Sequence, residues 1–505
     1  MAATYVLEVD WDNNGVFTGT GEDITARTLR VEFRRGRDYA SQLTGRSTAG
    51  RLLAALNNES GDYSSFNASS PIFGNILPGR KVRLRTTAPS AVTLWTGFLL
   101  RLVPDVRVGQ LKTAHLEAIG PLGWVNQREV RLVMATNELT GTAIGRVLDA
   151  VGWPAGDRTI DAGQTTMARF WTERVAGLAA LRSVEDSESG FLREGRDGKI
   201  IFEDRQHRLL SPHTVSQATF SDAAAAARPY LSIAQEDPLG NIFNDFQAEV
   251  PSFSVGSLAV MWVYPWTGAN SPLLAPGESR SWMAEYPTPD APTDAVGVDA
   301  WTTPVASTDY LANSASDGSG TDLTASVAVA ATKYGQSMKI TLTNNHASTP
   351  AYITLLRARG TPVTAADPVV LQAEDATSQT AYGKRSYPSP GKHIPDPEEA
   401  LDWANYNLGI YKDPIPLITL TLHGAYSSTI LTEILTRDLS ERVTVVAENS
   451  VGLGINQDFF IEAEQHMIMP GGYHVATYLL SPAEAYGGFW VLDVSELGFN
   501  SRVAY

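Results

Sequence analysis

The sequence contains no cysteine among its 505 residues. This absence excludes disulfide bonds, thiolate nucleophiles and cysteine-based zinc or iron–sulfur sites. Long apolar runs are missing too, because the longest, residues 253–266, is too short and too aromatic to span a bilayer. Residues 1–12 lack the basic start and the apolar core of a signal peptide. We therefore expect a soluble chain, consistent with assembly in a reducing cytoplasm.

Positive charge is also scarce. The chain has 39 Lys and Arg residues against 55 Asp and Glu residues, which gives a formal net charge of −16. Proteins that bind nucleic acids carry basic surfaces, so neither bulk nor sequence-specific nucleic-acid binding is expected. Common catalytic signatures are absent as well, among them the Gly-x-Ser-x-Gly elbow, the phosphate-binding loop and His-Glu-x-x-His. We expect neither an enzyme nor a cofactor.

The sequence does contain a succession of β patterns, interrupted by helical stretches. These patterns predict a mainly β fold with a smaller α+β portion, divided into several domains. The expected domains are an N-terminal β domain at 1–130, an α+β domain at 131–230, a connecting α/β domain at 231–265 and 366–415, an inserted β-sandwich at 266–365, and a C-terminal β domain at 416–505.

The N-terminal β domain is predicted from alternating apolar and polar residues. Residues 5–11 and residues 29–33 both alternate in this way. Asn14 and Gly15 lie between these two runs, and both residue types tolerate positive φ. The sequence therefore predicts a hairpin turn at Asn14-Gly15.

Residues 77–85 predict a turn followed by a strand with two unlike faces. Val82 and Leu84 point to one face and the basic side chains point to the other, because side chains alternate along a strand. Pro78-Gly79 before the strand predicts a type II turn, in which Gly79 takes a positive φ.

Helices are predicted by spacing and by capping residues. Residues 144–151 carry an apolar stripe at helical spacing, and a second helix is expected to start at Thr172. The sequence Arg-Asp-Gly at 196–198 predicts a tight hairpin after it. Asp396 is the expected N-cap of a third helix, with Pro397 at its first position.

One acidic motif has the spacing of a metal-binding loop. Asp10, Asp12 and Asn14, followed by Gly15, match the first half of a calcium loop. The glutamate that closes such a loop is expected at position 21, but Glu22 comes one position later, and the flanks read as strands. We favour an Asp/Asn-rich turn without a metal. If a cation binds, Asp10, Asp12 and Asn14 are its candidate ligands.

Two other acidic patterns offer groups for acid–base or metal chemistry. Glu462, Glu464 and His466 alternate along a predicted strand and therefore share one face. We favour the polar face of a half-buried hairpin for these three residues. The run Glu-Asp-Ser-Glu at 185–188 follows a helix pattern, and we favour a solvated loop because charge runs are usually exposed.

Two basic clusters are candidates for contacts between subunits. They lack the interleaved aromatic residues of a single-strand nucleic-acid platform. Guanidinium groups suit bidentate recognition of carboxylates at interfaces, so we favour pairing with acidic surfaces of neighbouring subunits. The candidates are Arg34, Arg35, Arg37, Lys81, Arg83 and Arg85.

Several blocks of the sequence resemble baseplate hub proteins from the tails of siphophages and related prophages. The first is a turn-rich loop at 56–64 that precedes the strand Pro-Gly-Arg-Lys-Val-Arg at 78–83. Later blocks follow in the same order as in that family. They lie at 147–154, 382–385, 435–443, 458–462 and 489–493. The resemblance covers about 1–230 and 366–505, so the β-sandwich at 266–365 is expected to be an inserted decoration.

The resemblance implies a structural role in the virion. Two β-barrel hub domains, one near each end of the chain, would lie side by side in each subunit. Three subunits would close a ring that joins the tail tube to the distal tip and surrounds the channel for DNA and the tape measure. The implied partners are two further copies of this chain, the distal tail or tail tube protein, the tape measure protein, and tail fibre or tip proteins. The implied location is the tail tip, after assembly in the host cytoplasm.

Two other classes of function stay open from the sequence. A receptor- or carbohydrate-binding tail protein would use the 266–365 module to bind a host surface glycan through aromatic side chains, although most of these are expected to fill the core. Those aromatic residues are Trp262, Trp266, Trp282, Tyr286 and Trp301. A tail-associated cell-wall hydrolase would use Glu185, Glu188 and Glu462 as its acids.

Overall fold

The computed structural model describes residues 3–37, 46–105, 111–237, 239–265, 270–286, 294–387, 393–483, and the strand pair formed by 489–490 and 502–503. The fold is mainly β, with several sheets and several domains, as predicted. Among the described helices, none has the length and apolar character needed to cross a membrane.

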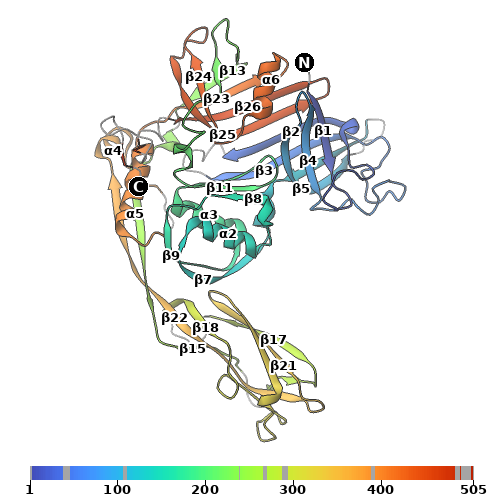
Figure 1. Cartoon of the computed structure of the whole chain (residues 1–505), viewed down its shortest axis with the longest axis vertical. Helices are drawn as coiled ribbons and strands as arrows, with labels where there is room; N and C mark the ends of the chain where they lie inside the picture. The colour runs from blue at the N-terminus through green and yellow to red at the C-terminus, as the bar shows by residue number, and fades with distance from the viewer. Residues whose placement is uncertain are drawn as a thin grey trace.

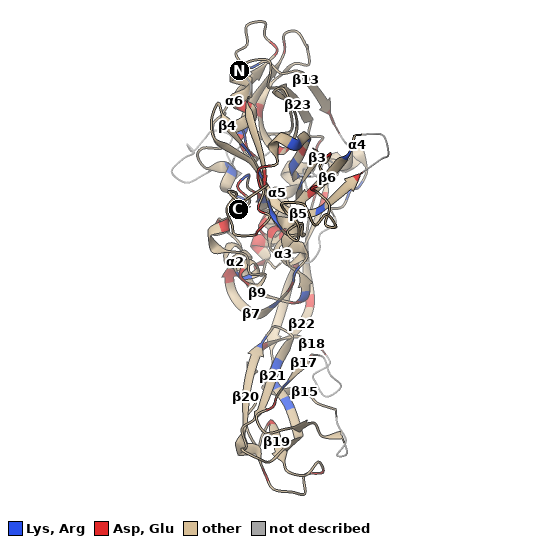
Figure 2. Ribbon diagram, turned by 90° about the vertical axis from the view of Figure 1, so that its right-hand side faces the viewer, with Lys and Arg blue, Asp and Glu red and all other residues tan. Residues whose placement is uncertain are grey.

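The molecule is elongated and has three bodies (Figure 1). A large sheet built from both ends of the chain lies at the top, and an α+β domain lies beneath it. A β module projects at the far end, reached through the long antiparallel pair of β14 (Asp245–Val255) and β22 (Ala351–Glu374). Charged residues gather mainly in the sheet and the α+β domain, whereas much of the module is uncharged (Figure 2).

The large sheet is continuous across both ends of the chain. Its strands follow the order β1-β4-β5-β6-β3-β2-β25-β26-β23-β13, and β24 joins β25 beside β12. The bounds are β1 Thr4–Val9, β2 Thr28–Arg37, β3 Ser47–Asn57, β4 Lys81–Ala88, β5 Val92–Asp105, β6 Thr113–Ile119, β12 Thr219–Ser221, β13 Ser232–Glu236, β23 Leu417–His423, β24 Arg442–Ala447, β25 Ile455–Met469 and β26 Tyr473–Pro482.

The two halves of this sheet meet where β2 pairs with β25. The pairing is antiparallel and runs from Val31 opposite Ile468 to Gly36 opposite Ala463. The hydrophobic core under the N-terminal half also includes Leu431 from helix α6 (Ser428–Thr436) and Ile468 from β25. The terminal regions therefore share both backbone hydrogen bonds and a core.

The hairpin predicted at Asn14-Gly15 is wrong. Strand β1 pairs with β4, so Leu7 lies opposite Leu84 and Val9 lies opposite Val82, and all four side chains are buried. Burial of these apolar residues favours the long-range pairing over a local hairpin. The Asn-Gly turn instead shapes a loop after β1.

The α+β domain packs helices against two small sheets. Helix α2 buries the stripe predicted at 144–151. The second helix, α3, begins at Gly177 rather than at Thr172, because Thr172 belongs to β9 and pairs with Leu132 of β7. The hairpin predicted at 196–198 joins β10 to β11, as expected. The bounds are α1 Pro121–Asn126, β7 Glu129–Leu139, α2 Thr140–Ala150, β8 Arg158–Ile160, β9 Thr166–Ala176, α3 Gly177–Glu188, β10 Phe191–Glu194 and β11 Ile200–Glu203.

The connecting region contains α4 (Ala376–Tyr382) and α5 (Pro397–Tyr411). The predicted cap of α5 is confirmed, since Asp396 accepts a hydrogen bond from the backbone N–H of Glu398 at 2.9 Å and Pro397 opens the helix. Helix α5 packs against β14 and β22, and Phe246 and Trp403 lie in the core that they share.

The projecting module is built from two sheets around one core, which contains Met338, Ile340 and Leu356. Strand β22 runs unbroken through the boundary expected at 365/366 and joins the module to the connecting region. The remaining strands are β15 Ala259–Val263, β16 Leu273–Leu274, β17 Ser279–Glu285, β18 Ala295–Thr302, β19 Tyr310–Asn313, β20 Val327–Lys333, β21 Ser337–Asn344, and near the C-terminus β27 Phe489–Trp490 and β28 Arg502–Val503.

Gly79 adopts the positive φ expected from the sequence, at +83°. Its N–H donates a hydrogen bond to the carbonyl of Leu99 at 2.7 Å. A Cβ placed on Gly79 would lie 2.9 Å from the indole ring of Trp124. The turn before β4 is therefore limited to glycine both by its backbone conformation and by its neighbour.

We expect Gly79→Ala to lower the free energy of unfolding by more than about 1 kcal/mol, because a positive φ is costly for L-residues and the methyl group would press on Trp124. Gly74→Ala is the matched control, since Gly74 has φ +80° but no atom within 4 Å of the new Cβ. Urea unfolding of the two variants measures the difference. An unchanged stability for Gly79→Ala would contradict the turn.

Candidate functional site

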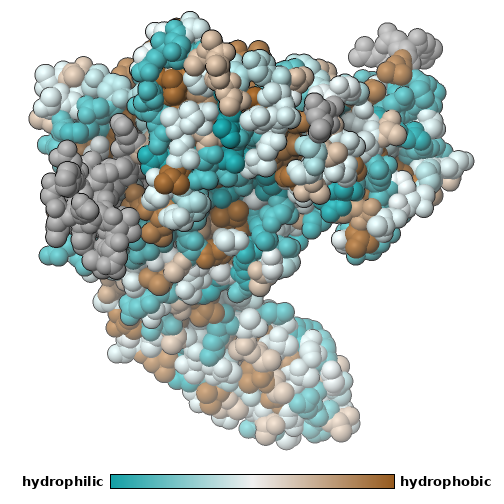
Figure 3. Space-filling model, turned by 45° about the horizontal axis from the view of Figure 1, so that its top comes forward, coloured by the Kyte–Doolittle hydropathy of each residue, from teal (hydrophilic) through white to brown (hydrophobic). Residues whose placement is uncertain are grey.

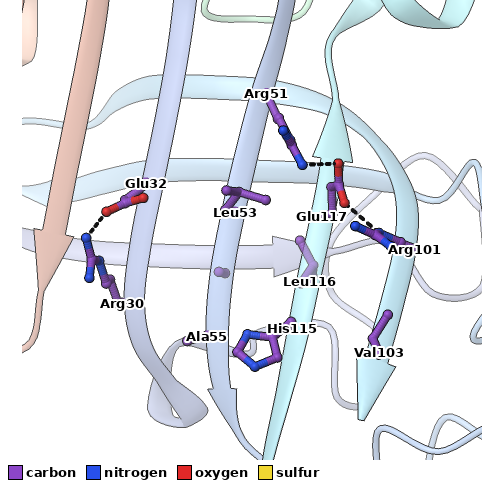
Figure 4. Close-up of a pocket in the computed structure, with 11 residues that line it drawn as sticks. Arg30, Glu32, Arg51, Leu53, Ala55, Arg101, Val103, His115, Leu116 and Glu117 are labelled. Atoms are coloured by element: carbon purple, nitrogen blue, oxygen red, sulfur yellow. Dashed lines mark hydrogen bonds and ion pairs between the residues drawn. The ribbon is translucent and has the colours of Figure 1, made fainter. Parts of the chain in front are cut away.

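The first candidate site is an open face of the large sheet. A shallow cavity of about 560 Å³ lies over β2, β3, β5 and β6 (Figure 4). Glu117 links two arginines across it, with Arg51 Nη2 and Arg101 Nε each 2.6 Å from a carboxylate oxygen. Arg30 and Glu32 pair beside them. This face therefore carries charges of both signs beside exposed apolar side chains, such as Leu53 and Val103.

The open face continues from the N-terminal half into the C-terminal half of the sheet. A second hollow of about 340 Å³ spans β2, β25, β26 and β23. Residues directly opposite one another in antiparallel strands share a face. One row of opposite residues crosses the junction between the halves. Its polar part consists of Arg51, Arg34, Gln465, Thr477, Thr421 and Ser232, and beyond Arg51 the row continues to the apolar residue Ile119. The space-filling view shows hydrophilic and hydrophobic residues interspersed over the surface that it presents (Figure 3).

The strand order of the sheet ends at β1 and at β13, and β5 leaves a further free stretch beyond the end of β4. Strand β4 pairs with β5 over residues 92–98, and β6 pairs with β5 over residues 98–105. Residues 101–105 therefore pair with β6 alone in the described part of the chain, and Leu100 lies in a bulge before them. At the opposite side, β13 pairs only with β23 among the described strands. Both edges present backbone groups that another strand can pair with.

Buried charges lie beneath the junction of β2 with β25. Arg35 Nε donates to Glu464 Oε1 at 2.9 Å, and Arg196 Nη2 donates to Glu464 Oε2 at 2.9 Å. Arg35 also donates to Asp438 at 2.6 Å. Arg35 comes from β2, Arg196 from the hairpin of the α+β domain and Glu464 from β25. The network therefore connects three parts of the chain in its interior.

A second buried carboxylate, Glu462, lies next to this network. Arg208 Nη1 donates to it at 2.6 Å, Arg37 Nε lies 3.0 Å from it, and Ser481 Oγ donates to it at 2.7 Å. Burial alone would raise the pKa of Glu462, but the two arginines outweigh burial and lower this pKa to about 2. Glu462 is thus ionised at neutral pH and has a structural role.

The predicted half-buried polar face at 462–466 is wrong, because Glu462, Glu464 and His466 are all fully buried. A β-bulge between Ile461 and Ala463 interrupts the alternation, and arginines from β2 and the α+β domain cover the strand. Burial lowers the pKa of His466, so its ring is neutral.

The basic candidates for subunit contacts have different positions. Arg35 is buried and Arg37 is half-buried, and each pairs with a carboxylate of β25 in the same subunit, namely Glu464 and Glu462. Arg83 and Arg85 of β4 each pair with Glu8 of β1 at 2.8 Å. Of the other two candidates, Arg34 is exposed on the open sheet face and Lys81 is half-buried. A contact of these six basic residues with a neighbouring subunit stays a prediction.

The run at 185–188 is not a solvated loop, because it forms the last turn of α3. Glu185 accepts a hydrogen bond from the N–H of Leu192 at 2.6 Å, and Glu188 accepts one from Thr140 Oγ1 at 2.6 Å. Both carboxylates are buried. Glu185 and Glu188 therefore link neighbouring segments through hydrogen bonds. These contacts are structural and give no support to the hydrolase alternative.

The aromatic residues proposed for sugar binding mostly fill the core of the module. Trp262, Tyr286 and Trp301 belong to that core, and Trp282 packs against it. Trp301 Nε1 donates to the carbonyl of Tyr334 at 2.7 Å. The fifth candidate, Trp266, lies outside the described residues.

The structure adds a third carboxylate to the candidate metal ligands. Asp10, Asp12 and Glu22 each place one oxygen within 4.8 Å of the others. Asn14 shapes the same loop, since its N–H donates to Asp10 at 3.0 Å. Glu22 lies one residue later than the closing glutamate of an EF-hand, so that spacing does not predict it as a ligand. The sequence signal for it is an acidic residue near the expected end of the loop.

No protein-family model matches the sequence, and no curated protein matches it. Solved structures do match. A tail protein from Neisseria meningitidis is 10% identical and has a TM-score of 0.51, with 96% of this chain and 98% of that chain covered. A 43 kDa tail protein of prophage MuSo2 from Shewanella oneidensis is 10% identical with a TM-score of 0.48, over 96% and 98% of the two chains. A prophage tail protein from Listeria monocytogenes is 9% identical with a TM-score of 0.42, over 95% and 94%. The chain therefore shares the fold of the Neisseria protein over nearly its whole length.

We expect Glu462→Gln to lower the free energy of unfolding at pH 7 by about 3–5 kcal/mol, because the variant leaves the buried charges of Arg208 and Arg37 without this carboxylate. A carboxylate with a lowered pKa stabilises the fold above its unfolded pKa, and this contribution is lost as the pH falls towards about 2. The variant should therefore show a weaker loss of stability with falling pH, starting at about pH 4.

Acid titration of the unfolding free energy tests this expectation. Glu448→Gln is the control, because Glu448 is exposed. If Glu462→Gln keeps both the stability and the pH profile of the parent chain, the ion pairs at Glu462 do not stabilise the junction.

Proposed function

We propose that this protein is a structural hub of a phage tail tip or baseplate. Three copies form a ring that joins the tail tube to the distal tip and surrounds the passage for DNA and the tape measure protein. Two observations support the proposal: the resemblance of the sequence blocks to hub proteins, and the fold shared with a tail protein over 96% of this chain. The proposed partners are the tail tube or distal tail protein, the tape measure protein, and fibre or tip proteins.

The observation that carries the proposal is the continuous sheet. The N-terminal and C-terminal halves lie edge to edge in one subunit, joined through β2 and β25. Three subunits would then supply six sheet halves. Six comparable sheet halves from three subunits can contact a six-fold tube on one side, while the three subunits contact a three-fold tip on the other.

The open sheet edges suggest how the ring closes. Residues 100–105 of β5 lie at one edge and β13 lies at the other. In the proposed ring, β13 of one subunit pairs with residues 100–105 of the next. Exposed edges promote uncontrolled pairing, and this closure would cover the edge of β13 and the free stretch of β5. Pro104 lies within the edge segment, where its missing N–H limits pairing with other chains.

The open face would then line the passage. Its row of polar residues crosses both halves, and Glu117 pairs with Arg51 and Arg101. The charged residues named on this face are Arg30, Arg34, Arg51 and Arg101 against Glu32 and Glu117, so the wall is mildly basic. In the ring, the two glutamates would limit the attraction of this wall for the phosphate groups of a passing polyanion.

Cysteine cross-linking tests the ring directly, since the natural chain contains no cysteine. The variant Val103→Cys/Ala234→Cys places one thiol at each sheet edge, on exposed residues. With a short bismaleimide linker, we expect covalent species of two and three chains and nothing larger, because a closed ring of three leaves neither of these two edges free.

The control variant is Thr332→Cys/Ala234→Cys, which moves one thiol to β20 in the projecting module. It should give only single chains. Products that grow beyond three chains, or an absence of cross-linked species from Val103→Cys/Ala234→Cys in concentrated protein, would contradict the proposed ring.

A further inference from the structure

Three carboxylates converge in the loop between β1 and the short 3-10 helix at Thr25–Arg27. One oxygen from each of Asp10, Asp12 and Glu22 lies within 4.8 Å of the other two. Calcium binds oxygen ligands at about 2.3–2.6 Å, so two ligands on opposite sides of one ion lie about 5 Å apart. The spacing of the three oxygens therefore fits a single shared calcium ion.

Backbone hydrogen bonds hold the loop in this shape. The two carboxylate oxygens of Asp10 accept from the N–H groups of Asn14 at 3.0 Å and Gly15 at 2.9 Å. Gly15 has φ +85°, which turns the chain back. The N–H of Val9 donates to the carbonyl of Glu22 at 2.9 Å and fixes Glu22 beside the end of β1. A loop one residue longer than an EF-hand thus still brings the closing glutamate to the aspartates.

The environment of the Glu22 side chain is a second observation that indicates a bound ligand. Glu22 is only 1% exposed, and its Oε2 accepts a hydrogen bond from the N–H of Gly19 at 2.6 Å. Its Oε1 is buried and has no hydrogen-bond partner among the described residues. A buried carboxylate oxygen without a partner is costly. Because this carboxylate lies within the cluster, a cation bound there would supply the partner that Oε1 lacks.

The charges around the loop strengthen this argument. Asp10 is also buried, at 2% exposure. Among the ion pairs of the described residues, none involves Asp10, Asp12 or Glu22, and the nearby arginines of β4 pair with Glu8 instead. Three carboxylates within 4.8 Å repel one another unless a positive charge offsets them.

We propose that Asp10, Asp12 and Glu22 bind one calcium ion, which fastens the loop to the end of β1. All three ligands are hard oxygen donors, as calcium prefers. Backbone carbonyls and water would complete its shell of six to eight ligands. Magnesium requires near-ideal octahedral geometry at about 2.0–2.1 Å and keeps several waters, so a loop of three carboxylates held by backbone contacts suits calcium better. This site does not depend on the proposed ring.

Isothermal titration of calcium into the full chain, after treatment with a chelator, tests the site. We expect one ion per chain with a dissociation constant between about 1 μM and 1 mM, and a higher melting temperature in calcium than in chelator. Glu22→Gln and Asp12→Asn should each weaken binding by about tenfold or more, because each removes one ligand charge.

Asp23→Asn is the matched control. Asp23 is exposed, lies next to Glu22, and accepts from the N–H of Thr25 at 2.9 Å, a bond that asparagine keeps. It should bind calcium within about twofold of the parent chain, because it supplies no ligand. Asp12 is exposed, so Asp12→Asn still tests the site if Glu22→Gln fails to fold.

Three results would overturn the proposal. The first is an absence of both binding heat and a thermal shift at millimolar calcium. The second is equal affinity of Asp12→Asn and the parent chain, which would place the ion elsewhere. The third is magnesium binding as tight as calcium binding, which would contradict the assignment to calcium.

Discussion

The pairing of β2 with β25 is the constraint on which the rest of the structure depends. It joins residues separated by more than 400 positions, such as Arg35 and Glu464, and makes one sheet from the two ends of the chain. A shift of this pairing by one residue would turn every side chain of β2 to the opposite face. Arg35 would then leave its carboxylates, and Phe33 would leave the core.

The buried charges determine the register of this pairing more than they add to the free energy of unfolding. Removing an arginine and a carboxylate from water costs several kcal/mol each, and their attraction offsets this only with good geometry and full hydrogen bonding. Glu464 meets that condition, because Arg35 and Arg196 donate to both of its oxygens. Both arginines outweigh burial and hold its pKa well below the ordinary value. We infer that this network stabilises one register of β2 against β25 and one position of the α+β domain beneath them.

Several local features could be predicted from the sequence, although the hairpin at Asn14-Gly15 could not, and the adjacency of the two terminal β regions was implied only by the resemblance to hub proteins. The cap at Asp396, the apolar stripe at 144–151 and the positive φ of Gly79 follow from neighbouring residues. The burial of Glu462 depends on arginines more than 250 positions away in the chain. The alternation of polar and apolar residues along β25 therefore cannot predict that this carboxylate is buried. The same limit applies to the acidic loop at 10–22, where a backbone hydrogen bond at the end of β1 holds Glu22 close to Asp10.

Electron cryo-microscopy of isolated tail tips would test the proposed ring. We expect three copies of this chain around a hole, with the sheet continuing from β13 of one subunit into residues 100–105 of the next. The open face with Arg34, Arg51 and Glu117 should line that hole. A map in which the β5 and β13 edges face solvent, or in which β2 and β25 belong to separate sheets, would contradict the account.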